Sequence, residues 1–368
     1  MTTSQHKVAI FGAGKIGAAI AKMLHHSGDY EVSVYDVNAV ALNLLKQQIA
    51  VVTKVFDVTD VAALEKLLSP FSAVISACSF DVNVKIAEAA LQAGVSYFDL
   101  TEDVATTAAI RELSKSAQQG QIFMPQSGLA PGFVGILAAD IAKRFDELET
   151  IKMRVGALPQ FPSNRMMYNL TWSTDGLINE YCNFCEAIEG GQLTKVIPLE
   201  GLEKFALDGV DYEAFNTSGG LGTLCETLAG KVRELNYKTV RYKGHQYLMQ
   251  FLTKELTLGR KERRALLKEI LETSIPITMQ DVVLVFVAVS GKRNGRFEQI
   301  TDARKIYHRE LYAESWSAIQ LVTSAGVCAV LDMFFNGDLP SRGFVKQEQV
   351  NLEIFLNNRF GQYYDVKG

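Results

Sequence analysis

Cysteine is scarce in this sequence, and neither sign of charge is in large excess. The 368 residues include only five cysteines, unevenly spaced, whereas a disulfide framework needs an even set in a short chain. The 37 basic and 41 acidic residues leave a formal net charge of −4. This balance provides no positive field for nucleic acid or for an anionic membrane. We therefore expect reduced thiols and no nucleic-acid partner.

Long apolar runs and an N-terminal leader are also lacking. Residues 1–7 contain no apolar signal-peptide core and lead directly into a strand-like segment. The longest apolar stretches, 282–289 and 325–335, fall short of the ~20 residues that cross a bilayer. The pair Cys182 and Cys185 has no second ligand pair nearby, so we expect no metal site. These absences predict a cytoplasmic protein without a membrane partner.

The composition that remains is that of a globular protein, with 48% hydrophobic and 21% charged residues. At about 150 residues per domain, the length predicts two domains.

Up to about residue 125, short apolar segments alternate with segments of helical apolar spacing. We expect strands at 8–11, 31–35, 53–56, 73–76, 97–100 and 122–124. We expect helices at 16–24, 40–48, 61–68, 82–93 and 106–118. This alternation predicts an α/β fold, a Rossmann-type doubly wound parallel sheet with helices on both faces.

The pattern changes after about residue 130 to a mixed α+β character, which predicts a second domain built on an open mixed sheet. We expect helices at 131–145, 173–187, 223–235 and 260–272, and strands at 150–156, 195–198, 282–290 and 305–312. A long apolar helix at 316–336 needs a packing partner, and we expect it to return to the first domain. The predicted domains are thus 1–130 completed by 315–368, and 131–314 as the substrate and dimerisation domain.

A G-x-G-x-x-G motif at 12–17 follows the strand at 7–11 and opens a helix, which is the context that the dinucleotide fingerprint requires. Gly12 allows the tight turn, Gly14 lets the backbone approach a pyrophosphate, and Gly17 lets the helix pack on the strand. The N–H groups at the helix N-terminus attract phosphate. The cofactor contacts predicted here are Gly12, Gly14, Lys15, Ile16 and Gly17.

Further cofactor contacts are predicted at the ends of the next strands. Asp36 ends the second strand, about twenty residues past the last glycine, where a carboxylate binds ribose hydroxyls and repels a 2′-phosphate. It favours NAD, with NADP also possible. Asp57 and Val58 follow the third strand and can flank the adenine, and Ala77 and Cys78 follow the fourth. The alternative for Asp57 is a helix cap or a turn.

Several segments together resemble the saccharopine dehydrogenase family, over roughly residues 7–340. They are 12–17 (GAGKIG), 87–100 (AEAALQAGVSYFDL), 128–132 (GLAPG), 155–159 (VGALP), 171–178 (TWSTDGLI) and 239–245 (TVRYKGH). The resemblance implies NAD(P)-dependent oxidoreduction at a carbon bonded to nitrogen. The implied substrate is an amino acid or an amino-acid-derived or polyamine-related amine, as in saccharopine reductases, lysine 6-dehydrogenases and carboxynorspermidine dehydrogenases.

The details of the resemblance favour the lysine 6-dehydrogenase branch through the 239–245 motif and Trp172. Two alternatives stay open: a dehydrogenase acting on a C–OH bond, and a non-catalytic NAD-binding regulator. We also expect a homodimer.

Oxidation of an amine needs hydride transfer to nicotinamide and a proton acceptor. Asp99, Glu102 and Asp103 come at the carboxyl edge of the predicted sheet, where a carboxylate can accept a proton or pair with a cationic substrate. Glu102 and Asp103 are therefore catalytic candidates. The alternative is a capping cluster for the helix that begins near Thr106.

Residues 126–132 follow a strand and precede a helix, whose first N–H groups can hold a substrate carboxylate. Ser127 is a catalytic candidate, and Gly128 is a predicted substrate contact. Several members of the resembled family carry cysteine where this sequence has Ser127, so a thiol at this position is not essential here. The alternative is a simple tight turn.

The 239–245 motif contains Arg241 and His245. The resemblance implies that Arg241 contacts substrate, and a guanidinium matches the carboxylate of an amino acid. His245 is either a proton carrier or a structural histidine. Trp172 and Asn216 are further substrate-binding candidates, with packing and turn formation as their alternatives.

Overall fold

The computed structural model describes residues 5–365, and these form two compact units. Unit 1 contains the described residues up to Phe133 together with Val322–Asp365. Unit 2 contains Val134–Leu321. The chain thus leaves unit 1 once, builds unit 2, and comes back.

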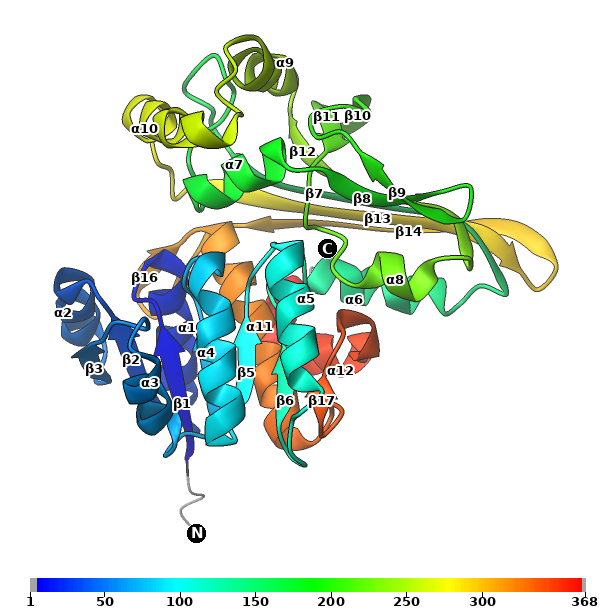
Figure 1. Cartoon of the computed structure of the whole chain (residues 1–368). Helices are drawn as coiled ribbons and strands as arrows, with labels where there is room; N and C mark the ends of the chain where they lie inside the picture. The colour runs from blue at the N-terminus through cyan, green and yellow to red at the C-terminus, as the bar shows by residue number, and fades with distance from the viewer. Residues whose placement is uncertain (1–4, 366–368) are drawn as a thin grey trace. The chain divides into compact units, whose positions relative to one another are not determined.

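Unit 1 is a parallel seven-stranded sheet with the order β17-β6-β5-β4-β1-β2-β3. Its strands are β1 (His6–Phe11), β2 (Tyr30–Asp36), β3 (Val52–Val55), β4 (Ala73–Ser76), β5 (Ser96–Asp99), β6 (Ile122–Met124) and β17 (Gly343–Phe344). Its helices are α1 (Lys15–Ser27), α2 (Ala39–Gln48), α3 (Val61–Leu68), α4 (Phe80–Ala93), α5 (Val104–Ser114), α12 (Leu352–Asn357) and most of α11 (Ala318–Asn336). Figure 1 shows α4 and α5 on one face of the sheet and α11 on the other. The prediction of a doubly wound α/β fold is confirmed, and the strand order reverses between β1 and β4, where ligands bind in such sheets.

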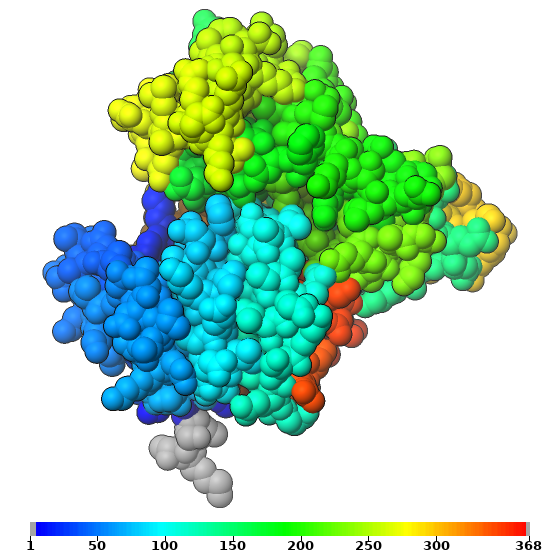
Figure 2. All heavy atoms as spheres, in the orientation of Figure 1, coloured from blue at the N-terminus to red at the C-terminus, as the bar shows by residue number. Residues whose placement is uncertain are grey.

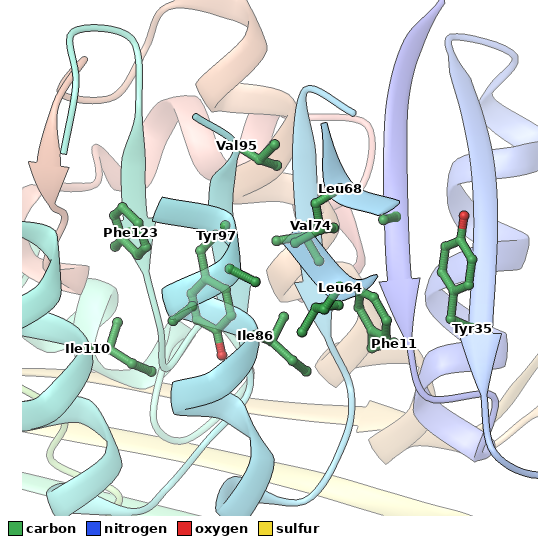
Figure 3. Close-up of a cluster of buried hydrophobic side chains, with 14 of the residues drawn as sticks. Phe11, Tyr35, Leu64, Leu68, Val74, Ile86, Val95, Tyr97, Ile110 and Phe123 are labelled. Atoms are coloured by element: carbon green, nitrogen blue, oxygen red, sulfur yellow. The ribbon is translucent and has the colours of Figure 1, made fainter. Parts of the chain in front are cut away.

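The core of unit 1 forms where alternate strand residues meet α3, α4 and α5. Figure 3 shows this cluster, with Phe11, Val74 and Tyr97 from the sheet against Leu64 and Ile86 from the helices. Each of these side chains is no more than 1% exposed. Burial of this kind stabilises by about 25 cal/mol per Å² of apolar surface, and it fixes the strand ends that carry the site.

Unit 2 contains a mixed eight-stranded sheet with the order β10-β11-β12-β7-β13-β14, in which β8 also pairs with β12 and β9 pairs with β8. Its long strands are β7 (Glu147–Pro159), β11 (Val210–Asn216), β12 (Val232–Tyr242), β13 (Asp281–Arg293) and β14 (Arg296–Tyr307). The shorter ones are β8 (Cys185–Glu189), β9 (Gln192–Val196) and β10 (Glu203–Leu207), and a separate two-stranded sheet contains β15 (Arg309–Leu311) and β16 (Glu314–Trp316). The helices are α6 (Phe133–Ala142), α7 (Thr174–Cys182), α8 (Leu224–Leu228), α9 (His245–Gln250) and α10 (Arg264–Ser274). Helices α9 and α10 form part of the outer surface of this unit (Figure 2).

Two helices expected in unit 2 are shorter than the apolar spacing predicts. The segment at 223–235 is helical only in α8, and its last residues enter β12, a central strand paired with both β11 and β7. The segment at 173–187 leaves α7 at Cys182 and enters β8, which forms a hairpin with β9 across Gly190 and Gly191. Both glycines have positive φ, as a tight hairpin turn requires. In each case pairing with a distant strand overrides the local helical spacing.

Helix α11 is the one described helix long and apolar enough, by length and composition, to cross a membrane. Within the structure 78% of its apolar window is buried. Such burial is typical of a core helix in a soluble protein.

Candidate active site

The glycine turn after β1 is closely packed on one side and open on the other. Gly12 has a φ of +101°, and a Cβ there would lie 2.7 Å from the carbonyl oxygen of Ala77. A Cβ on Gly17 would lie 1.9 Å from the carbonyl oxygen of Gly12. A Cβ on Gly14 would meet nothing within 4 Å. Gly12 and Gly17 are therefore needed to build the turn, whereas Gly14 leaves a space free beside it.

Helix α1 begins at Lys15, directly beside this free space. Gly14 is its N-cap, with an extended backbone and no side chain to accept from the first N–H groups. Lys15 and Ile16 thus form the helix start, where N–H groups lack partners within the helix and the dipole favours an anion. The absent Cβ and the uncapped helix start together fit a dinucleotide pyrophosphate.

The Asp36 carboxylate is fixed next to the same turn. Its Oδ2 accepts a hydrogen bond from the Ala13 N–H at 2.6 Å, and its Oδ1 accepts from the Asn38 N–H at 2.8 Å. Two backbone donors therefore hold the carboxylate at the end of β2. This is the position from which an acidic residue binds the ribose hydroxyls of NAD.

Replacing Asp36 with serine is expected to change cofactor choice. The substitution removes both the acceptor for the ribose hydroxyls and the charge that repels a 2′-phosphate. The affinity for NADH should fall by about tenfold, the cost of one charge-assisted hydrogen bond, while the affinity for NADPH rises. Fluorescence titration with both cofactors measures this, with Asp60→Ser at the N-cap of α3 as an acidic control. A wild-type preference for NADPH would contradict the role assigned to Asp36.

Ala77 and Cys78, at the end of β4, lie beside the glycine turn. The Ala77 N–H donates to the carbonyl oxygen of Phe11 at 2.8 Å, and its own carbonyl faces Gly12. Burial raises the pKa of the Cys78 thiol to about 11, so the thiol stays neutral at physiological pH. The structure thus places both residues beside the glycine turn, and a cofactor contact by either one stays a prediction.

Asp57 and Val58, at the end of β3, have local partners. The Asp57 carboxylate accepts from the Thr59 N–H at 2.9 Å, and this hydrogen bond lowers its pKa. Val58 packs against the hydrophobic core of unit 1. These contacts are those of a turn, the alternative considered for Asp57, and adenine binding by either residue stays a prediction.

The carboxylates after β5 have different environments. Asp103 is the N-cap of α5, and its Oδ1 accepts from the Thr106 N–H at 2.7 Å. Glu102 precedes it and is half-buried. Asp99 is completely buried; burial raises its pKa to about 6, and hydrogen bonds from the N–H groups of Thr101 and Gln126 limit the rise. Catalytic roles for Glu102 and Asp103 stay predictions, and Asp103 has a capping role in addition.

Ser127 and Gly128 belong to a segment that folds tightly after β6. The Ser127 side chain is 2% exposed, and its hydroxyl donates to the Met124 carbonyl at 2.9 Å. The Gly128 carbonyl accepts from the Phe133 N–H at 3.0 Å, and a Cβ on Gly132 would lie 2.0 Å from it. The segment is therefore a rigid turn, and Ser127 as a catalytic group and Gly128 as a substrate contact stay predictions.

Arg241 lies near the end of β12 with a side chain only 2% exposed. Its Nη1 donates to the Val240 carbonyl at 2.9 Å, and the guanidinium carbon lies 5.1 Å from the ring centre of Tyr168 and 5.9 Å from that of Tyr181. The Nε atom is buried and has no hydrogen-bond partner among the described residues. A buried donor without a partner is costly, so this atom is one that a ligand can satisfy.

His245 begins α9 close to the same aromatic residues. Its Nδ1 lies 2.9 Å from the Met166 carbonyl oxygen, and its Nε2 lies 3.2 Å from the Tyr181 hydroxyl. Burial, together with the charge of Arg241, lowers its pKa to about 3. The ring is therefore neutral at physiological pH with both nitrogens engaged. These contacts match the structural alternative, and proton transfer by His245 stays a prediction.

The pKa of His245 gives stability a defined pH dependence. A histidine whose pKa falls from 6.5 to about 3 on folding stabilises the fold above pH 6.5, and this contribution is lost as the pH falls toward 3. His245→Gln, which cannot titrate, should therefore lose less stability than the wild type between pH 7 and pH 4.5. Urea unfolding of both proteins at these two pH values measures the difference. Equal losses would contradict a buried neutral histidine.

Trp172 and Asn216 have packing and turn contacts. The Trp172 ring lies where a Cβ on Gly176 would come within 2.4 Å, so it packs on the first turn of α7. The Asn216 Nδ2 donates to the Ile197 carbonyl at 3.2 Å. Both contacts fit the alternatives that the sequence leaves open, and substrate binding by these residues stays a prediction.

Sequence reasoning did not single out three residues that shape these sites. Tyr168 and Tyr181 surround Arg241, but they come from a loop and from α7, and no local pattern connects them with β12. Glu213 accepts the N–H groups of Gly244 and Gln246 and so fixes the start of α9. Only the strand register, which pairs Glu213 with Arg241, reveals this contact.

Family models match nearly the whole chain. One, described as saccharopine dehydrogenase NADP binding domain, matches residues 8–124, and another, described as saccharopine dehydrogenase C-terminal domain, matches residues 128–358. The chain belongs to the saccharopine dehydrogenase family. Membership in this saccharopine dehydrogenase family confirms the resemblance seen in the sequence. It also confirms a nicotinamide-dinucleotide cofactor, because the NADP-binding model covers the glycine turn and Asp36.

Solved structures share the fold. The saccharopine dehydrogenase (L-Glu forming) from Saccharomyces cerevisiae is 16% identical, with a TM-score of 0.77 over 94% of each chain. The DAP dehydrogenase of C. glutamicum in complex with DAP is 11% identical, with a TM-score of 0.50 over 96% of each chain. At these identities the likeness concerns the fold alone.

Proposed function

We propose that this member of the saccharopine dehydrogenase family is an NAD-dependent dehydrogenase that acts on the C–N bond of an amino acid or an amino-acid-derived amine. The observation that carries the proposal is the buried Arg241 guanidinium in unit 2, with an Nε that has no partner among the described residues. An amino-acid substrate brings a carboxylate, which accepts from this donor.

A buried acceptor in the segment that follows Tyr168 supports the same class of substrate. Asn169 comes directly after Tyr168 in the chain, and its Oδ1 is buried without a hydrogen-bond partner among the described residues. Tyr168 itself lies under the Arg241 guanidinium. A ligand with both a carboxylate and N–H donors can satisfy an unpaired donor and an unpaired acceptor.

The two units divide the work in this proposal. Unit 1 holds the dinucleotide at the glycine turn, with Asp36 selecting NAD over NADP. When bound, the nicotinamide supplies the hydride acceptor. Unit 2 orients the substrate through Arg241, and the half-buried Glu102 and Asp103 are the candidate proton acceptors, as carboxylates near a strand end can be.

A substrate panel tests the proposal. The protein is mixed with NAD or NADP and a set of amino acids and diamines, and with reduced cofactor and amine–aldehyde mixtures for the reverse direction. The change in nicotinamide absorbance should appear with at least one amine. Turnover of hydroxy acids or alcohols alone would replace the C–N assignment with C–OH chemistry. NADH binding with no turnover of any substrate would favour a non-catalytic regulator.

A further inference from the structure

A buried carboxylate links the ends of neighbouring strands in unit 1. Asp99 is the last residue of β5 and is 0% exposed. Its Oδ1 accepts from the Gln126 N–H at 3.0 Å and from the Thr101 N–H at 2.9 Å. Its Oδ2 accepts from the Tyr97 hydroxyl at 2.8 Å and from Asn83 Nδ2 at 3.3 Å. One carboxylate thus receives two backbone donors on one oxygen and two side-chain donors on the other.

The network continues to the next strand. The Ser76 hydroxyl, at the end of β4, donates to the Oδ1 of Asn83 at 2.7 Å, and the Cys78 N–H reaches the Ser76 oxygen at 3.4 Å. Because β4, β5 and β6 are neighbours in the sheet, Asp99 lies at the centre of a hydrogen-bond network that connects the carboxyl ends of these three strands. Carboxyl ends of strands near the switch point are where such sheets bind ligands.

The segment that Asp99 holds has an unusual backbone. Gln126 is a non-glycine residue with a φ of +62°, a strained conformation that persists only where surrounding contacts enforce it. Its N–H donates to the Asp99 carboxylate, and its carbonyl accepts from Gln347 Nε2 at 3.0 Å. The next N–H, of Ser127, donates to the Asp99 carbonyl at 2.9 Å.

We propose that Asp99 is a positioning residue for the dehydrogenase reaction, one that holds Gln126 and Ser127 in place at the carboxyl end of β6 without contacting the substrate. The proposal rests on the proposed function. The competing role is that of proton acceptor. The complete burial of Asp99 and the four hydrogen bonds that its carboxylate accepts argue against that role, because a group that takes a proton from the substrate must contact the substrate.

Three variants of the full chain separate these roles. Asp99→Ala removes all four acceptor contacts. Asp99→Asn keeps one carboxamide oxygen, which must face the Thr101 and Gln126 N–H groups because backbone N–H groups can only donate. The new amide NH₂ then faces Tyr97, whose hydroxyl can accept a hydrogen bond, and Asn83, whose amide can rotate to present its oxygen. Asp99→Asn therefore holds the segment but carries no charge. Tyr97→Phe removes a contact to the other oxygen and is the matched control for lost stability.

The expected result is a loss in kcat of about a hundredfold for Asp99→Ala, the scale of a small misplacement near reacting groups. The kcat of Asp99→Asn should stay within about threefold of the wild-type kcat, and the kcat of Tyr97→Phe should equal that of the wild type. All three variants should keep the wild-type Kd for NADH. Amide hydrogen exchange at Gln126 and Ser127 should accelerate in Asp99→Ala only.

Several outcomes would overturn the proposal. If Asp99→Asn is as inactive as Asp99→Ala, the charge is required and Asp99 transfers a proton. If Asp99→Ala keeps its kcat and loses only thermal stability, as Tyr97→Phe does, its role is structural. If Asp99→Ala does not fold, Asp99→Asn decides the question instead. Faster amide hydrogen exchange at Gln126 in Asp99→Asn, without a loss of kcat, would show that the position of this segment does not matter for the reaction and would overturn the proposal. If the wild type turns over no amine, the proposed function fails, and the exchange comparison still decides whether Asp99 holds the segment.

Discussion

The Gly14→Val variant is expected to lose at least a hundredfold in NADH affinity and to keep its fold. The Gly14 backbone has φ −69° and ψ −172°, which any residue can adopt. A Cβ there meets no protein atom within 4 Å, so the side chain enters the space assigned to the pyrophosphate. A hundredfold corresponds to about 2.7 kcal/mol of binding free energy. Fluorescence titration of NADH, with circular dichroism to follow the fold, measures both parts.

Gly17→Ala provides the contrast for this experiment. Its Cβ would lie 1.9 Å from the Gly12 carbonyl oxygen, so the turn itself must shift. We expect this variant to lose thermal stability as well as affinity. If Gly14→Val binds NADH as the wild type does, the cofactor does not lie at this turn.

Arg241→Met should reduce kcat/KM by ten- to a hundredfold on a responsive amino-acid substrate. The substitution keeps much of the stem that packs near Tyr168 and Tyr181 but removes the guanidinium. The loss of one charge-assisted contact costs about 1.5–3 kcal/mol, which gives this range. The Kd for NADH should stay unchanged because the predicted cofactor contacts lie in unit 1.

Arg154→Met is the matched control for Arg241→Met. Arg154 is 3% exposed in β7 of the same sheet, and its Nε and Nη2 each lie 2.9 Å from a Glu203 oxygen. Its hydrogen bonds are thus made within the protein, so we expect lower thermal stability and normal kinetics per folded molecule. If Arg241→Met behaves in the same way, Arg241 is structural and its charge is balanced by Glu180, the carboxylate that acts on it electrostatically.

The fold of unit 1 could be predicted from the sequence because its signals are local. The strand before Gly12, the helix after it and the acidic residue that ends β2 fall within one short β-α-β segment. Gly12 and Gly17 have a steric reason to be glycines, and the free space beside Gly14 fits the predicted approach of a pyrophosphate. In unit 2 the decisive contacts join residues that are far apart in the sequence. Strand β12 pairs with β7 across roughly 80 residues, and no local sequence pattern predicts that pairing.

The candidate site shows the same division. Asp36 and Gly14 could be placed by spacing alone, because a known turn geometry connects them. The environment of Arg241 could not, since Tyr168 and Tyr181 reach it from separate segments that only the folded sheet brings together. The positioning role proposed for Asp99 could not be predicted from the sequence for a related reason. Its hydrogen-bond partners Gln126 and Asn83 come from separate segments, at the end of β6 and in α4.

The late return of the chain to unit 1 has a consequence for biosynthesis. Strand β17 pairs with β6, and Tyr364 stacks on Phe133 with ring centres 4.0 Å apart, so the last part of the chain completes a core that its first third begins. During translation the ribosome must add roughly 200 residues after β6 before β17 emerges, which takes about 10–40 s at ordinary elongation rates. Throughout that interval one edge of the nascent sheet stays unpaired and open to other chains. The nascent chain is therefore exposed to aggregation before synthesis ends, and a ribosome-associated chaperone would act on it at that stage.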